Sequence, residues 1–82
     1  MVNEEIIQQL NIIFRQVFDN NDISVDETTT AADLEDWDSL NHLQLVVAIE
    51  KHYHIRFTAA QAQNWSNVGD IVAAIIQKQA VS

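Results

Sequence analysis

The sequence predicts an all-α domain of four helices, and three observations support that prediction. Apolar residues recur at three- and four-residue intervals in three separate stretches, the spacing of helices with one buried face. The 82 residues include one glycine and no proline or cysteine, which disfavours a loop-rich disulfide scaffold and a disordered tail. Hydrophobic residues make up 48% of the chain, so we expect residues 1–82 to form a single domain around one core.

The first helix is predicted from about Asn3 to Asp19. Asn3 is a suitable N-cap, and Glu4 and Glu5 match the positive end of the helix dipole. A continuous apolar stripe runs along this stretch and consists of Val2, Ile6, Leu10, Ile13, Phe14, Val17 and Phe18.

A long loop is predicted from about Asn20 to Asp38. The helical periodicity stops there, and Asp, Asn, Ser and Thr, which favour turns, dominate the composition. Ile23, Val25 and Leu34 are spaced through the loop as expected anchors onto the helices. We therefore expect an ordered loop, and long ordered loops in small domains often serve function.

The second helix is predicted from about Ser39 to His52, with Asp38 as its N-cap. Its inward stripe is expected to consist of Leu45, Val46, Ile49 and Tyr53, with His42 near the edge. The opposite face carries polar residues, namely Asn41, Gln44, Glu50 and Lys51. Leu40 and Val47 are apolar residues that the inward stripe does not explain, so they are candidates for exposed contact residues.

The last third of the chain predicts two more helices. Ile55 and Phe57 are expected to fill the core, and Thr58 and Gln61 have the spacing of a capping box that starts a short third helix through about Asn64. Ser66 is the predicted cap of a final helix that ends near Ala80. The apolar stripe of that helix consists of Val68, Ile71, Val72, Ile75 and Ile76.

Acidic residues outnumber basic ones by twelve to four, which gives a formal charge of −8. Such a surface repels nucleic acids and anionic membranes and attracts basic protein partners. Residues 1–5 carry acid where a secretory signal needs positive charge, and no apolar run approaches the roughly 20 residues of a membrane span. We therefore expect a cytoplasmic monomer with no nucleic-acid partner and no membrane insertion.

Ser39 is the candidate functional residue, because it stands where the second helix begins. Its hydroxyl is expected to be exposed and able to accept a covalent group, and a helix N-terminus favours an attached phosphate. The pair Asp38 and Ser39 is also what an ordinary helix start looks like.

A wider pattern surrounds the serine, namely Asp33-Leu34-Glu35-Asp36-Trp37-Asp38-Ser39-Leu40, then Asn41-His42-Leu43-Gln44-Leu45-Val46-Val47-Ala48-Ile49-Glu50, and finally Tyr53, Ile55 and Phe57. This pattern resembles the acyl carrier protein family, and the resemblance covers essentially the whole chain. It implies a four-helix bundle of the acyl-carrier type, with a long loop between helices one and two and a short third helix. It also implies that the serine of the Asp-Ser-Leu triplet carries 4′-phosphopantetheine.

On that resemblance, a phosphopantetheinyl transferase using coenzyme A and magnesium would modify Ser39, and Asp38 would help to hold the metal. The thiol of the arm would hold an acyl or aminoacyl group as a thioester, and the protein itself would not be an enzyme. Acyl-loading and acyl-transfer enzymes are the other implied partners. The expected contact residues are Leu40, Val47, Asp36 and Gln44. The alternative for Leu40 and Val47 is that they simply pack at the edge of the core.

The sequence departs from the carriers of fatty acid synthesis in two places. Residues 35–37 (Glu-Asp-Trp) replace a glycine stretch, and Trp37 resembles the Trp-Asp-Ser-Leu form of many stand-alone carriers in specialised bacterial pathways. The exposed face of the second helix is also poor in acid, with Glu50 as its one clear acidic residue. Partners are therefore expected to use the acidic loop, unless that loop is simply solvated; its acids are Asp33, Glu35, Asp36 and Asp38.

Two other functions compete with a covalent carrier. One is a non-covalent acidic helical module that docks a basic partner, with Ser39 only a helix-start residue. The other is a small enzyme using Ser39 with a histidine, which lacks a strained elbow motif and a base assignable from spacing. His42, His52 and His54 match no metal-binding spacing and are expected to be solvated or at the core edge.

Overall fold

The computed structural model describes residues 2–81, with the side chains of residues 3–79, and over that range it contains helices and no strand. The four α-helices are α1 (Val2–Val17), α2 (Ser39–Tyr53), α3 (Ala59–Gln63) and α4 (Val68–Val81). A single 3₁₀ turn, η1 (Ala31–Asp33), interrupts the loop between α1 and α2. The predicted four-helix fold, with its long first connection and short third helix, is confirmed.

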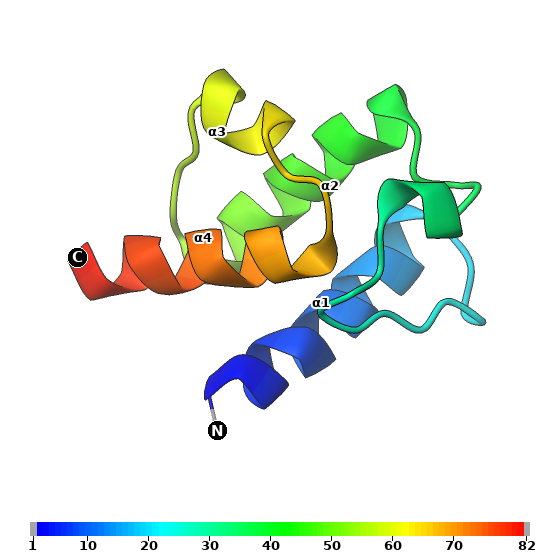
Figure 1. Cartoon of the computed structure of the whole chain (residues 1–82), viewed down its shortest axis with the longest axis horizontal. Coiled ribbons are helices and arrows are strands. Elements are labelled where there is room, and N and C mark those ends of the chain that lie inside the picture. The colour runs from blue at the N-terminus through cyan, green and yellow to red at the C-terminus, as the bar shows by residue number, and fades with distance from the viewer. Residues whose placement is uncertain (1, 82) are drawn as a thin grey trace.

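Helix α1 packs against both α2 and α4, and these three helices enclose the core (Figure 1). The short helix α3 lies on one side of the bundle, while the long loop and η1 lie at the other end of the view. The fully buried large side chains come from all three long helices and are Leu10, Phe14, Leu45, Ile49, Val68, Ile71 and Ile75. The predicted stripe of α1 is confirmed from Ile6 to Phe18, whereas the side chain of Val2 lies outside the described residues.

The two ends of α1 differ from the prediction. Asn3 is not the N-cap, because the helix already begins at Val2, and the side-chain Nδ2 of Asn3 instead donates to Glu27 Oε1 at 3.4 Å. At the other end the helix stops at Val17, because Asp19 adopts a left-handed conformation with φ of 51°. The amide of Asn20 then donates to the Arg15 carbonyl at 3.0 Å, which closes the end of the helix.

The long loop is ordered because side chains of α1 hold its backbone. The Asn11 side chain accepts from the amide of Val25 at 2.7 Å and donates to the Val25 carbonyl at 3.0 Å. Arg15 Nε donates to the Ile23 carbonyl at 2.7 Å. Ile23 and Val25 are buried and Leu34 is half-buried against the core, so the three predicted anchors are confirmed. Polar side chains of α1 satisfy the backbone at Ile23 and Val25.

The same loop also caps the start of α4. The amides of Val68 and Gly69, which have no partner within a new helix, donate at 2.9 Å to the carbonyls of Thr29 and Glu27. Gly69 is the only glycine of the chain, and a Cβ atom there would lie 3.0 Å from the Glu27 carbonyl oxygen. The close approach of the two backbones therefore explains the glycine.

The predicted cap of the last helix, Ser66, is wrong by one residue. Asn67 Oδ1 accepts from the Asp70 amide at 2.9 Å, so Asn67 is the cap, and the Asp70 carboxylate accepts from the Ser66 amide at 2.9 Å. Serine and asparagine are equally suitable caps, and the pairing of Asn67 with Thr30 of the loop determines the register.

The start of α3 matches its prediction. Thr58 Oγ1 accepts from the Gln61 amide at 3.1 Å, and the Gln61 side chain accepts from the Thr58 amide at 2.9 Å, which is the reciprocal pattern of a capping box. Ile55 and Phe57, which precede it, are half-buried and pack against the core. Both the capping box and the packing of these two residues are therefore confirmed.

Tyr53 provides a test of this packing. Its hydroxyl oxygen is buried without a hydrogen-bond partner, and burial raises the pKa of the phenol. We expect Tyr53→Phe to leave the free energy of unfolding unchanged or to raise it by up to about 1 kcal/mol, because the substitution removes an unsatisfied polar group.

A raised pKa means that the folded chain keeps the phenolic proton after the unfolded chain has lost it. The wild type should therefore lose stability relative to Tyr53→Phe as pH rises above about 10. Urea unfolding of both proteins at pH 7 and pH 10.5 measures the two effects, and a clear loss of stability in Tyr53→Phe at pH 7 would show that the hydroxyl has a partner.

Candidate functional site

Ser39 is the first residue of α2, and Asp38 is the cap that sets it there. Asp38 has extended backbone angles, and its Oδ1 accepts from the Asn41 amide at 2.8 Å. The Asn41 side chain in turn donates to the Asp36 carbonyl at 2.7 Å. The predicted cap is confirmed, and these two hydrogen bonds hold the exposed serine at the junction of loop and helix.

Trp37, which immediately precedes the cap, is a core residue, a role that the sequence did not reveal. Only 6% of its surface is exposed. Its ring meets the edge of Phe14 of α1 with the ring centroids 5.2 Å apart. Burial of an aromatic ring of this size supplies a large apolar contact, so the position of Asp38 and Ser39 is set by the packing of their neighbour.

His42 connects Trp37 to helix α3. The indole Nε1 of Trp37 donates to His42 Nδ1 at 2.9 Å, and the two rings are stacked with an interplanar angle of 17°. On its other side, His42 Nε2 lies 2.9 Å from the Ala62 carbonyl. An indole N–H can only donate, so Nδ1 is the acceptor and the imidazole proton lies on Nε2, which donates to Ala62.

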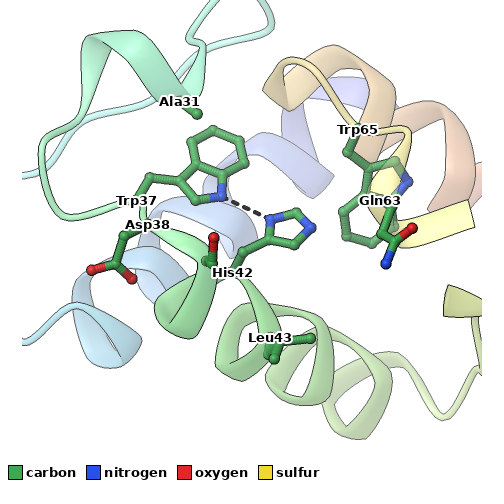
Figure 2. Close-up of a pocket in the computed structure, with 8 residues that line it drawn as sticks. Ala31, Trp37, Asp38, His42, Leu43, Gln63 and Trp65 are labelled. Atoms are coloured by element: carbon green, nitrogen blue, oxygen red, sulfur yellow. Dashed lines mark hydrogen bonds between the residues drawn. The ribbon is translucent and has the colours of Figure 1, made fainter. Parts of the chain in front are cut away.

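An open hollow of about 400 Å³ lies beside Ser39. Figure 2 shows Trp37 and His42 on one side of it and Trp65 and Gln63 on the other, with the hydrogen bond between Trp37 and His42 drawn as a dashed line. The residues that line it are Ala31, Trp37, Asp38, Ser39, His42, Leu43, Gln63 and Trp65. Both tryptophans of the chain therefore border the space next to the serine.

Trp65 is held from two directions. Its ring meets Phe57 edge-on with centroids 4.9 Å apart, and it meets His42 with centroids 5.8 Å apart. The ring is half-buried, so it packs on the core with one part and borders the hollow with another.

The outer face of α2 carries three exposed apolar side chains. Leu40 is 65% exposed, Leu43 is 64% exposed and Val47 is 47% exposed. The sequence pattern singled out Leu40 and Val47, and the structure adds Leu43, which a helical wheel places on the same face. Gln44 is also exposed on this helix. We call the surface formed by Leu40, Leu43, Gln44 and Val47 the α2 face.

The acidic loop lies next to the α2 face. The four acids that the sequence singled out, Asp33, Glu35, Asp36 and Asp38, are all exposed. The carboxylates of two of them also stabilise the local backbone, because Asp33 accepts from the Thr30 amide at 3.0 Å and Asp38 accepts from Asn41. The junction that presents Ser39 is therefore negatively charged and locally rigid.

Neither nitrogen of His42 is placed to activate Ser39, because one accepts from Trp37 and the other donates to Ala62. His52 and His54 lie at the opposite end of α2. Over residues 2–81, no three His, Cys, Asp or Glu side chains come together as a metal site. In the same range no helix is long and apolar enough to cross a membrane.

Comparisons with known proteins agree with this geometry. The profile of the family described as "Phosphopantetheine attachment site" matches residues 8–75. The fold is similar to that of a holo acyl carrier protein from Geobacter metallireducens, with a TM-score of 0.83 and 42% identity over 90% of this chain and 85% of that one. No curated protein matches the sequence.

A second solved structure, a putative acyl carrier protein from Mycobacterium tuberculosis, shares the fold with a TM-score of 0.71. It is 24% identical over 90% of this chain and 93% of that one. The chain therefore belongs to the phosphopantetheine-attachment family and is an acyl carrier protein. Members of this family carry a covalently attached 4′-phosphopantetheine and interact with the enzymes that load and transfer acyl groups.

Proposed function

We propose that Ser39 is the attachment residue of the 4′-phosphopantetheine arm. The observation that supports this most is its position: an exposed serine at the first residue of α2, in an Asp-Ser-Leu triplet within the matched region, beside an open hollow. Its hydroxyl is accessible to a modifying enzyme from solvent. The arm supplies a thiol that holds the acyl group as a thioester.

The residues around Ser39 fit an attached phosphate diester. Amides at the start of α2 lack intrahelical partners, and the positive end of the helix dipole favours a negative group there. The hollow provides room on the side of Trp65 and Gln63 for the part of the arm nearest the protein. The protein itself contributes position, a negative surface and an apolar docking face.

The modifying enzyme in this proposal is a phosphopantetheinyl transferase that uses coenzyme A and magnesium. Asp38 is exposed and adjacent to the serine, so its second carboxylate oxygen can reach a metal ion while Oδ1 caps the helix. The same residue then performs a structural task and a task in the modification reaction.

We further propose that partner enzymes dock on the α2 face and the adjacent loop, using Leu40, Val47, Gln44 and Asp36. All four are exposed, and the two apolar ones, Leu40 and Val47, keep 65% and 47% of their surface open to solvent. Isolated exposed apolar residues are common, but three on one helical face next to the modified serine form a contact surface. The low acidity of this face favours partners with apolar contacts there and basic groups near the loop.

The chain acts as a single-domain, monomeric cytoplasmic carrier without catalytic activity of its own, and its cargo is an acyl or aminoacyl group. The Trp-Asp-Ser-Leu form of the site supports a role in specialised bacterial biosynthesis. Both ring nitrogens of His42 already make hydrogen bonds, to Trp37 and to Ala62, so His42 is not free to act as the base that a serine hydrolase needs.

The attachment site is tested by mass spectrometry. Incubation of the apo protein with coenzyme A, magnesium and a broad-specificity transferase should add about 340 Da, the mass of the phosphopantetheinyl group. Ser39→Ala should show no increase. If neither protein gains mass, or if both do, Ser39 is not the attachment residue; the first result would favour a non-covalent interaction module.

The two tasks of Asp38 are separated by a pair of substitutions. Asp38→Ala should lower the free energy of unfolding by about 1 kcal/mol, because the cap is lost, whereas Asp38→Asn should keep the cap and the stability. Both variants should slow modification by at least about 10-fold, since neither has the carboxylate. Urea unfolding and initial modification rates are the measurements, and a wild-type rate for Asp38→Asn would leave Asp38 with its structural task alone.

The docking face is tested against a control of equal exposure. Val47 and Ile12 are each 47% exposed, but Ile12 lies on α1 and is not part of the α2 face. We expect Leu40→Ala and Val47→Ala to raise the KM of the transferase for the carrier by about 3- to 10-fold with little change in kcat, in the range of ordinary interface residues. Ile12→Ala should leave both constants unchanged, and an equal effect of all three variants would argue against the α2 face.

A further inference from the structure

We propose that His42 is a positioning residue that couples the loop before Ser39 to helix α3, so that the two sides of the hollow move together. The proposal builds on the proposed attachment at Ser39, because that residue lines the same hollow. The geometry consists of one imidazole ring with two hydrogen bonds of 2.9 Å, each to a different segment of the chain.

On the loop side, His42 satisfies a buried indole. Trp37 is almost fully enclosed, and its N–H can only donate. Without an acceptor in this position, the indole N–H would stay buried and unsatisfied, at a cost that favours a different position of the ring. Because Trp37 lies two residues before Ser39, a shift of the backbone at Trp37 displaces the start of α2.

On the other side, His42 bonds to a short helix that buries one residue of its own. Helix α3 contains five residues, of which Ala62 is the only buried one, and helices of that length are not stable alone. The His42 ring reaches the Ala62 carbonyl near the end of α3 and also contacts the edge of Trp65. The imidazole therefore fixes the far side of the hollow to α2.

This double role requires a side chain that offers one acceptor and one donor. The ring presents an acceptor to Trp37 and a donor to Ala62 at the same time, on opposite edges of one rigid plane. Leucine has a similar volume but can make neither bond. The amide of glutamine also presents one acceptor and one donor, so it is the conservative replacement.

If His42 couples the two segments, a substitution on the loop side should change the stability of α3. Trp37→Phe keeps an aromatic ring against Phe14 but removes the N–H donor to His42. If His42 transmits position, this variant should loosen α3, whose connection to Trp37 passes through the imidazole. If His42 only fills space, Trp37→Phe should leave α3 as it is.

The experiment is amide hydrogen exchange by NMR on the full apo chain. In His42→Leu and in Trp37→Phe, we expect the amides of Ala62, Asn64 and Trp65 to exchange about 5-fold faster than in the wild type, the effect of losing one net hydrogen bond. His42→Gln should restore exchange to within about 2-fold. His52→Leu, an exposed histidine of the same helix, is the control and should change none of them.

The amides of α1 and α4 distinguish coupling from general destabilisation, because in His42→Leu and Trp37→Phe they should accelerate less than those of α3, and in His42→Gln and His52→Leu they should keep wild-type exchange. Equal acceleration in every helix, unchanged exchange in α3, or failure of His42→Gln to restore it would each overturn the proposal. A parallel assay of transferase modification should show a lower kcat for His42→Leu with KM unchanged, since the α2 face is intact. Failure of Ser39 modification in the wild type would refute the proposed attachment site, while hydrogen exchange would still decide the role of His42.

Discussion

The buried indole of Trp37 is the constraint on which the presentation of Ser39 depends. Its ring packs against α1, and its N–H is directed to an imidazole of α2, so the loop reaches α2 in one position and orientation. The cap at Asp38 follows one residue later, and the serine one residue after that. Core packing two residues away therefore holds Ser39, the proposed attachment residue, in a fixed place.

Helix α2 divides its surface among three tasks. One side is buried in the core through Leu45 and Ile49, the edge at His42 faces α3, and the outer side presents Leu40 and Val47. A helix of 15 residues has enough turns to do this because successive positions point 100° apart. The α2 face can therefore change without disturbing the core, and the hydrogen bonds of His42 are separate from both.

Much of the fold could be predicted from the sequence because it depends on periodicity. Three correctly predicted features depend only on residues close together in the sequence. They are the apolar stripe of α1, the cap at Asp38 and the capping box at Thr58. The wrong cap at Ser66 and the wrong start at Asn3 have a different origin. In both cases the loop between α1 and α2 contacts the helix end, and a contact between distant segments leaves no local pattern.

The candidate site could likewise be predicted only where it depends on local sequence. Ser39, Asp38 and the exposed Leu40 were readable from the chain, whereas the burial of Trp37 was not, because a tryptophan in an acidic loop gives no periodic signal. The exposure of Leu43 was equally hidden, since apolar residues surround it in the sequence. One clue was available: a histidine five residues after Trp37, one turn into α2, is in reach of its indole.

The contact between the loop and the start of α4 also bears on the order of folding. The carbonyls of Glu27 and Thr29 receive the amides of Gly69 and Val68, so about 40 residues of chain must close before either bond forms. The residues that line the hollow beside Ser39 all lie within that closed segment. Most contacts of a helical bundle are local and form quickly, whereas this one is long-range and slow to find. We therefore expect the serine junction to reach its final form only after α4 has docked, so a nascent chain would present Ser39 to a modifying enzyme only once its last helix has been made.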